Sequence, residues 1–502
     1  MSPFNRLMEK LHVLILVLFL SGPMLVFASK GPEDRSAFGT SQTEFPPLLK
    51  LIAPRSKGRE KIADAIFDRS LLQREAVAMR NRFSWYQLGF IEERRIVSGA
   101  PGWLFYKPAF AAWDCSKHES ARSGLQRLAF LLELAEANSL SLAIASAPNK
   151  ASIQSREVVG RAKHRSRCYF EFEREYRAMM RRYASSRLID HAVVLEPRTR
   201  TSEPYLRLDT HWARLASFAA ISQLVKESGV GNLPPLDLPR FMEEKSTDLG
   251  NQMLLLDEQV FDQAVSVAGI MNADQAPGSS EEIVILHDSF YHGARDYLEA
   301  MIPGVRLVNY RNAEEELPSL EDVDFLILES VERAILTRVY SQDYWGWNGW
   351  VGEWVLSGMG RESRNCRWDL AEDMLAGVAT YDLTLSEDGS AHKNGLRPRL
   401  VAEMPLGKWT GRVCLEVALE VGEEQKIQIF LSTTDPLFDS DVPRGELEKF
   451  VEARSVEGWL DPSNHSLSFV LPRENVDRRL RLDFDAPFDT TRILRLRVAP
   501  RN

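Results

Sequence analysis

The segment Ile283-Val-Ile-Leu-His-Asp-Ser-Phe290 is an apolar run that ends in a serine. Other apolar runs of strand length lie in the same part of the chain, and helical spacing separates them, as at 125–135 and 169–184. Nearly continuous apolar strands that alternate with helices are typical of a parallel sheet covered on both faces. We therefore predict an α/β domain over residues 83–340, with strands at 140–147, 187–190, 283–286, 305–308 and 323–328.

Residues 365–502 have a different pattern. Short alternating runs follow one another with turn residues between them, at 380–385, 399–404, 412–421, 426–432, 466–471, 479–484 and 492–498. This pattern predicts an antiparallel, all-β sandwich domain. The connection at 341–364 is rich in tryptophan and glycine. Its rings either stack on sugars in a carbohydrate groove or pack between the two domains.

The amino terminus carries an export signal. Residues 11–28 are apolar almost throughout, follow Arg6 and Lys10, and end in Val26-Phe27-Ala28, which suits a signal peptidase. The length of this run lies between that of a signal peptide and that of a membrane span. We expect residues 1–29 to be a cleaved signal or an N-terminal anchor, followed by a lead segment at 30–82 and an exported remainder.

The composition limits the classes of partner. At 502 residues, with 44% hydrophobic and 26% charged residues, the chain can bury ordinary cores in two or three domains. The net charge of −9 argues against nucleic acid as a partner, because the overall field repels a polyanion. An anionic polymer would need a local basic patch.

The four cysteines predict disulfides, because an even number in an oxidising compartment is usually paired. Their spacing favours Cys115 with Cys168 and Cys366 with Cys414, although other connectivities and free buried thiols stay open. The chain has no Cys-x-x-Cys, and His287 and His292 have no matching carboxylate or cysteine spacing. No metal site and no other cofactor are therefore expected.

Two segments together carry the chemistry. Asp209 and His211, in Arg207-Leu-Asp-Thr-His-Trp-Ala-Arg214, offer a carboxylate and an imidazole, and Ser289 stands between a strand and a predicted helix. Imidazole activates a serine hydroxyl, a carboxylate holds the imidazole in the right tautomer, and a helix N-terminus stabilises an oxyanion. The alternative is that Asp209 or Thr210, and Asp288 or Ser289, only cap the helices that follow them.

Five segments occur in one order across roughly residues 85–340: Gly102-Trp-Leu-Phe-Tyr106, Ala147-Pro-Asn-Lys150, Asp209-Thr-His-Trp212, His287-Asp-Ser-Phe290 and Glu332-Arg333. In these segments the chain resembles the periplasmic alginate O-acetyltransferase family, SGNH-hydrolase-like proteins that act on secreted polysaccharides. The resemblance implies Ser289 as the acetyl-accepting nucleophile, His211 as the general base and Asp209 as its orienting acid. It also implies a rearranged SGNH topology, in which the serine follows the Asp-x-His segment, and a C-terminal sandwich that binds carbohydrate.

The function that the resemblance implies is acetyl transfer to hydroxyls of an exported polysaccharide in the periplasm. A membrane-bound acyltransferase would then supply the acetyl group, and other polysaccharide biosynthesis and export proteins would be partners. Two alternatives stay open. The same triad could act as a carbohydrate acetylesterase, or the protein could be a non-catalytic scaffold that binds the polymer.

Four further residues are candidate substrate contacts. Arg311 follows a strand end, where α/β sheets present ligand contacts, but it could equally be a surface ion-pair partner. Lys150 follows another strand, and a structural role is its alternative. His287 stands where the resembled family commonly has glycine, and is either a packed histidine or a substrate contact. Trp212, from the Asp-Thr-His-Trp segment, completes the set.

Overall fold

The computed structural model describes residues 71–111, 118–182, 187–200, 203–234, 238–256, 258–271, 282–316, 323–340, 365–375, 378–386, 390–393, 398–404, 413–421, 425–433, 455–460, 466–471, 476–484 and 492–501. The predicted signal or anchor at 1–29, most of the lead segment and the tryptophan-rich connection lie outside these residues. Among the helices that are described, none is long and apolar enough to cross a bilayer.

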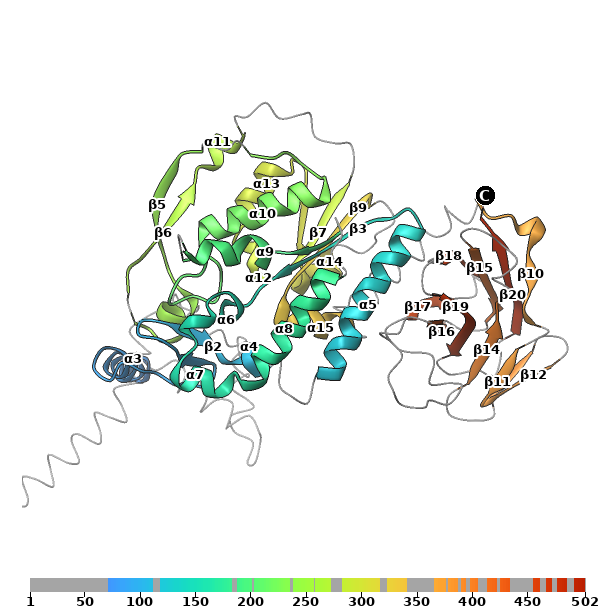
Figure 1. Ribbon diagram of the computed structural model, residues 1–502, viewed down its shortest axis with the longest axis horizontal. Coiled ribbons are helices and arrows are strands. Elements are labelled where there is room, and N and C mark those ends of the chain that lie inside the picture. Colours follow the sequence, from blue (N-terminus) through green and yellow to red (C-terminus); the bar gives the residue numbers. More distant parts are fainter. Residues whose placement is uncertain are drawn as a thin grey trace, which may run out of the picture.

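A five-stranded parallel sheet forms the centre of the α/β unit, in the order β4-β3-β9-β7-β8 (Figure 1). Its strands are β3 Ser141–Ala147, β4 Leu188–Asp190, β7 Ile283–His287, β8 Arg306–Asn309 and β9 Phe325–Val331. Each coincides, within three residues at its ends, with an apolar run that predicted a strand. The parallel α/β prediction is therefore confirmed.

Helices cover both faces of this sheet. In β7, Val284 and Leu286 enter one core while Ile283 and Ile285 enter the other, so no position of the strand faces water. One core is closed by α5 His118–Ala137, α8 Arg167–Arg182, α14 Ala313–Glu316 and α15 Glu332–Tyr340. The other is closed by α9 Ala192–Leu195, α10 Arg214–Ser228, α11 Val267–Met271, α12 Ser289–His292 and α13 Arg295–Met301.

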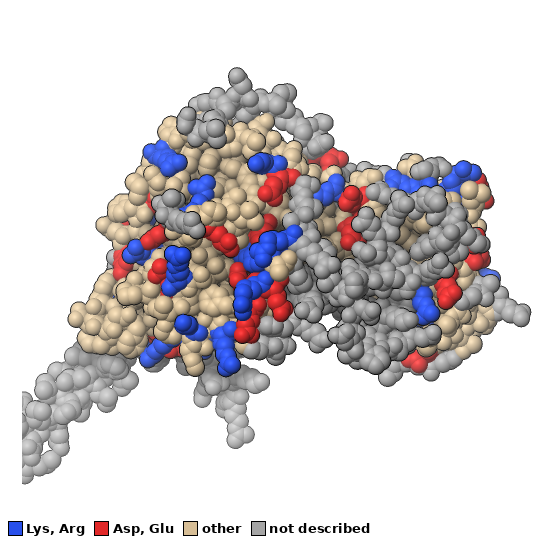
Figure 2. Space-filling model, in the orientation of Figure 1, with Lys and Arg blue, Asp and Glu red and all other residues tan. Residues whose placement is uncertain are grey.

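Helix α8 illustrates why these segments are amphipathic helices. Tyr169, Phe172, Tyr176 and Met180, at spacings of three and four, are all buried. Charged side chains of both signs gather over its outer side, across the middle of the face in Figure 2. The burial of one apolar stripe against the sheet therefore positions α8 and leaves the charges of its outer side in solvent, whereas Arg177 of the same helix is buried.

Smaller elements lie at the edge of the sheet where the strands end. They are α3 Leu71–Tyr86, the hairpin β1 Ile96–Ser98 and β2 Leu104–Tyr106, α4 Lys107–Ala111, α6 Lys150–Ile153, the 3-10 turns η3 Ser155–Glu157, η4 Glu196–Arg200 and η6 Tyr310–Asn312, and α7 Gly160–Arg165. A second hairpin, β5 Arg240–Lys245 and β6 Val260–Val265, encloses a π-helix, η5 Asp248–Met253. Neither this hairpin nor η5 was predicted.

The C-terminal region consists of antiparallel sheets, as predicted. Two larger sheets have the orders β10-β20-β15-β18 and β11-β14-β19-β16-β17, and their inward side chains share a core; β12 and β13 form a separate two-stranded sheet. The strands are β10 Glu372–Asp373, β11 Ala379–Tyr381, β12 Leu383–Leu385, β13 Ala391–Lys393, β14 Arg399–Glu403, β15 Val413–Glu420, β16 Gln425–Thr433, β17 Ser455–Leu460, β18 Ser466–Leu471, β19 Val476–Phe484 and β20 Arg492–Pro500, preceded by η8 Trp368–Leu370. The run expected at 380–385 is two strands, because Asp382 adopts a φ of 52°. The exact domain boundaries stay predictions.

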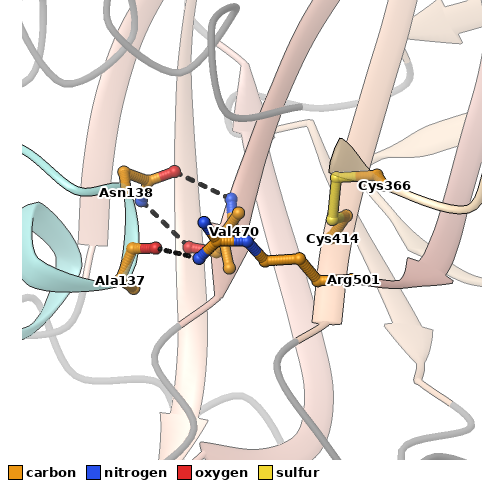
Figure 3. The surroundings of a disulfide bond; sticks show 6 residues. All are labelled: Ala137, Asn138, Cys366, Cys414, Val470 and Arg501. Atoms are coloured by element: carbon orange, nitrogen blue, oxygen red, sulfur yellow. Dashed lines mark hydrogen bonds between the residues drawn. A yellow bond between two sulfur atoms is a disulfide. The ribbon is translucent and has the colours of Figure 1, made fainter. Parts of the chain in front are cut away.

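The β region is joined to the end of α5 beside a disulfide (Figure 3). The bond between Cys366 and Cys414 is present, so this predicted pair is confirmed. Cys168 is also disulfide-bonded, and its predicted partner Cys115 lies outside the described residues. Near the first bond, the Asn138 amide donates to the Val470 carbonyl at 3.0 Å and accepts from the Val470 N–H at 2.9 Å.

Candidate active site

The three predicted triad residues come together at the carboxyl edge of the central sheet. The Ser289 hydroxyl lies 2.9 Å from His211 Nε2, and His211 Nδ1 lies 2.9 Å from Asp209 Oδ1. The same Asp209 oxygen accepts the His211 backbone N–H at 2.9 Å. With Nδ1–H donating to the carboxylate, Nε2 is free to accept the serine proton, which is the tautomer that general-base catalysis needs.

Helix capping does not explain Asp209. Helix α10 begins at Arg214 after Ala213, which makes no side-chain cap, and the Arg214 N–H donates to Asp262 at 2.8 Å. Asp209 instead sits in the loop before the helix and orients His211. Capping does explain Asp288, whose Oδ1 accepts the Phe290 N–H at 2.8 Å at the start of α12. The Ser289 side chain therefore begins the first turn and remains available to His211.

Burial and charge act in opposite directions on this pair. Burial alone raises the pKa of Asp209, but the hydrogen bond to His211 and the imidazolium charge outweigh it and hold that pKa below its usual value. Burial lowers the pKa of His211, and the Asp209 hydrogen bond and the nearby carboxylates more than offset this, so that the pKa of His211 is raised. The imidazole is therefore a stronger base than a free histidine.

Asp248 is a second carboxylate at the site, and sequence reasoning missed it. Its Oδ1 accepts the Thr210 N–H at 2.7 Å, its Oδ2 accepts the Thr210 hydroxyl, and Oδ2 lies 3.7 Å from His211 Nδ1. Burial, together with the charge of Asp209, raises the pKa of Asp248 to about 6. It opens η5, which belongs to none of the predicted elements, so no local pattern pointed to it.

The ligand atoms of Asp209, His211 and Asp248 lie within 4.8 Å of one another, close enough to hold a metal ion. Each is nevertheless engaged in a hydrogen bond already. Asp209 and His211 bond to each other, and both oxygens of Asp248 accept from Thr210. Hydrogen bonding therefore accounts for the cluster, and the geometry is that of a carboxylate-oriented histidine.

Lys150 holds the segment that carries Asp209 through hydrogen bonds to its main chain. Its ammonium donates to the backbone carbonyls of Leu104, Leu206, Arg207 and Asp209, at 2.8, 2.8, 2.7 and 3.0 Å. The side chain is buried, and burial lowers its pKa to about 7 against the opposing charges of nearby carboxylates. The prediction that Lys150 contacts substrate is therefore wrong. Its ammonium is hydrogen-bonded to these carbonyls, so Lys150 has the alternative, structural role.

The other candidate contacts are spread around the site. Trp212 is 1% exposed and packs edge-on against Phe290 at 5.2 Å between ring centroids, so it is a core residue and that prediction was wrong. His287 is also buried: it donates from Nδ1 to the Asp288 carbonyl at 2.8 Å, and burial lowers its pKa. It is thus the packed histidine of the two alternatives. Arg311 is exposed, in η6 after β8, on the far side of β7 from β9.

The buried carboxyl of Glu329 fixes the turn that carries Ser289. The Asp288 N–H donates to Glu329 Oε2 at 2.9 Å, and Asp288 Oδ2 accepts the Val331 N–H at 2.8 Å. Burial, with the charge of Asp288, raises the pKa of Glu329 well above its usual value. These bonds tie the end of β7 to β9 and fix the position of Ser289.

A cavity of about 610 Å³ lies beside the segment that precedes Asp209. It is lined by Leu206, Arg207 and Leu208, by Glu203, and by residues of α3 and β6 that include Trp85 and Phe261. The triad side chains do not line it. Ser289 therefore stands at the sheet edge, outside this cavity.

Residues 96–257 match the family model described as "SGNH hydrolase-like domain, acetyltransferase AlgX". This part of the chain is similar to that family. The matched SGNH hydrolase-like region contains Asp209, His211 and Asp248 and ends before Ser289, which the fold brings to it. The match confirms the resemblance to the alginate O-acetyltransferase family and the SGNH-like fold class. It also supports an O-acetyltransferase activity.

Solved structures similar to the chain include three proteins. The O-acetyltransferase domain of Pseudomonas putida AlgJ is 16% identical, with 52% of this chain and 98% of that chain covered and a TM-score of 0.36. Pseudomonas aeruginosa AlgX is 11% identical, with 84% of this chain and 98% of that chain covered and a TM-score of 0.32. Bacillus cereus PatB1 is 10% identical, with 49% of this chain and 96% of that chain covered and a TM-score of 0.33. No curated protein sequence matches the chain. The family assignment therefore rests on the family model.

Proposed function

We propose that the protein is a polysaccharide O-acetyltransferase that works through an acetyl-Ser289 intermediate. The observation that carries this proposal is the hydrogen-bonded chain from Asp209 through His211 to Ser289, with 2.9 Å at each step. Asp209 and His211 lie in the region that matches an acetyltransferase family model. A serine, a neutral imidazole and a buried carboxylate in this order are the parts of a covalent acyl-transfer site.

In the first step, Ser289 Oγ attacks the acetyl carbonyl carbon while its proton passes to His211 Nε2. The carbonyl electron pair moves onto the acyl oxygen. When it returns, the bond to the donor oxygen breaks and the donor takes the proton from His211. The products are acetyl-Ser289 and the deacetylated donor, with His211 neutral again.

In the second step, a sugar hydroxyl replaces the donor. His211 Nε2 removes the hydroxyl proton, the sugar oxygen attacks the acetyl carbon, and Ser289 leaves with the proton that His211 returns. Asp209 keeps the imidazole oriented and stabilises the imidazolium in both steps. The backbone N–H of Ser289 is the main-chain donor that we assign to the acyl oxygen.

The partners follow from an exported location, which the apolar run at 11–28 suggests. Acetyl-CoA is not available outside the cytoplasm, so a membrane-bound acyltransferase is the proposed acetyl donor in the periplasm. The acceptor is an exported polysaccharide, and the proteins that make and export it are further partners. The β region at 365–502 is proposed to bind the polymer.

The first experiment compares Ser289→Ala with Ser155→Ala, which removes an exposed hydroxyl elsewhere in the same unit. On a chromogenic acetate ester, Ser289→Ala should lower kcat by about 10⁴-fold or more, while Ser155→Ala should match the unmodified protein. Mass spectrometry should find the acetyl group on the peptide that contains Ser289. An oligosaccharide acceptor should then become acetylated, whereas release of acetate alone would indicate an esterase. Full activity of Ser289→Ala would exclude both enzymes.

A further inference from the structure

The cavity of about 610 Å³ beside the segment that precedes Asp209 has no part in the chemistry described so far. Its volume falls within the range of about 300–1,000 Å³ that small-ligand sites usually occupy. Its described walls come from the end of α3, from the turn between β1 and β2, from residues 203–208 and from residues 258–261 at the start of β6. These parts lie far apart in the sequence, so the cavity exists only in the folded chain.

Aromatic side chains line this cavity. Phe261 is 56% exposed and Tyr86 is 53% exposed, while Trp85 is partly buried against the core beneath them. Large rings that gather at a surface mark a site where a ligand or a partner covers them. The face of such a ring packs against the apolar face of a sugar, and the polar groups nearby bond its hydroxyls.

Hydrogen bonds hold the walls of the cavity in place. Trp85 Nε1 donates to Glu258 Oε1 at 2.8 Å, and the Tyr86 hydroxyl donates to the Leu256 carbonyl at 3.2 Å. The main chain of Glu258 is fixed by Asn251, whose amide donates to the Glu258 carbonyl at 2.8 Å and accepts its N–H at 3.1 Å. Because these groups are already ordered, a ligand loses less free energy to the ordering of the protein.

The charged groups of the cavity favour one class of sugar. Arg207 Nη2 donates to Glu203 Oε1 at 2.6 Å, so the charges of this pair compensate each other. Glu258 accepts from Trp85 and, among the residues that the structure describes, forms no ion pair. The cavity therefore keeps one uncompensated carboxylate. This group accepts hydrogen bonds from sugar hydroxyls or ammonium groups and repels a sugar carboxylate.

Two walls of the cavity continue into the segments around the triad. Leu208 lines the cavity and is followed directly by Asp209. In β6, Phe261 is followed by Asp262, which accepts the Arg214 N–H at 2.8 Å at the start of α10. The cavity thus adjoins the segment that carries Asp209 and His211. A polymer longer than the cavity can occupy it while another of its units lies at the triad.

We propose that this cavity is an acceptor subsite for a polymer of uncharged or amino sugars, and not for a polymer of uronates. Phe261 and Tyr86 pack against the sugar rings, and Glu258 accepts hydrogen bonds from their hydroxyl or ammonium groups. The cavity selects the acceptor, and the triad transfers the acetyl group to it. The assignment rests on the acyl-transfer function proposed above, because it names the acceptor class of that reaction.

The test measures saccharide binding by the full chain carrying Ser289→Ala, so that no acetyl transfer takes place. The probes are β-1,4-linked hexasaccharides of glucose, of glucosamine and of mannuronate, each titrated by calorimetry. The first two should bind about tenfold more tightly than the third, because a uronate carboxylate meets Glu258. Phe261→Ala should weaken binding of the first two by about tenfold, because it removes a stacking face.

Phe241→Ala is the matched control. Phe241 is an exposed phenylalanine of the same hairpin and does not line the cavity. Phe261 pairs with Glu244, three residues from Phe241, so the two rings lie on opposite faces of the hairpin. This control should bind all three probes as its parent does. Glu258→Gln keeps the size of the side chain and an acceptor for Trp85, and it should bring the affinity for mannuronate close to that for glucose.

Each outcome has a defined meaning. If Phe261→Ala binds the glucose and glucosamine probes as tightly as Phe241→Ala does, the cavity is not a sugar site and the proposal is overturned. Equal binding of mannuronate and glucose before Glu258 is changed would overturn the assigned sugar class. Binding in the β region is told apart because it does not respond to Phe261→Ala. Failure of the triad is measured separately, as ester turnover that survives Ser289→Ala, so the two proposals fail independently.

Discussion

Replacing Lys150 with methionine should loosen the segment that carries Asp209. The ammonium bonds four carbonyls, and those of Leu206, Arg207 and Asp209 belong to this segment, while that of Leu104 belongs to β2. Methionine keeps most of the volume and none of the donors. The carbonyls would then be buried without partners, unless the segment moves to expose them to water.

The size of the effect follows from the contacts. An ammonium has three protons, and a hydrogen bond from a charged donor contributes about 1.5–3 kcal/mol, which gives roughly 4–9 kcal/mol in total. Against this, the buried charge itself costs several kcal/mol, and methionine removes that cost. We expect Lys150→Met to lower the free energy of unfolding of the α/β unit by roughly 2–5 kcal/mol.

The measurement is urea unfolding followed by tryptophan fluorescence, together with ester turnover per folded molecule at low urea. The control is Lys163→Met, which removes an exposed ammonium from α7 and should stay within about 0.5 kcal/mol of the unmodified protein. Turnover should fall in Lys150→Met even where the protein is folded, because Asp209 loses the support of its carbonyl. If Lys150→Met matches Lys163→Met in both stability and turnover, the proposed role of Lys150 is wrong.

Two further predictions concern charge at the site and the attachment of the β region. The charge of Asp248 raises the pKa of His211, and His211 acts as a base only when neutral, so kcat/KM should rise with pH through that raised pKa. Asp248→Asn should move this rise to lower pH, and an unchanged profile would contradict the coupling. Asn138→Ala should destabilise the β region by roughly 1–3 kcal/mol, because the Val470 N–H and carbonyl lose their partners. Calorimetry should show its transition at lower temperature with ester turnover unchanged, whereas an unaltered transition would exclude this role for Asn138.

The strands of the central sheet could be predicted because their signal is local. A strand buried on both faces has to be apolar at successive positions, and 283–286 and 323–328 meet this condition in any chain context. Strand β17 and the hairpin β5–β6 were missed. Hairpin residues such as Phe241, Met242 and Phe261 are exposed, so burial imposes little pattern there.

Asp209, His211 and Ser289 could be named from the sequence because each lies beside the end of a predicted strand or helix. Asp209 and His211 are two residues apart, a spacing at which one carboxylate oxygen reaches both the main-chain N–H and Nδ1 of the histidine. The same reasoning failed for Lys150 and Trp212. Both follow the right motifs, but burial decides whether a side chain faces a substrate, and burial depends on what packs over the motif.

By itself, the sequence determined the class of each unit and the residue types available for acyl transfer, and it favoured the pairing of Cys366 with Cys414. These follow from periodicity, spacing and chemical type, which are local properties of the chain. The tertiary structure alone decided that Asp248 lies beside His211 and that the Lys150 ammonium bonds the carbonyls of the triad segment. Those contacts depend on which strands become neighbours in the sheet, and strand order is set by the packing of the whole domain and not by any one segment.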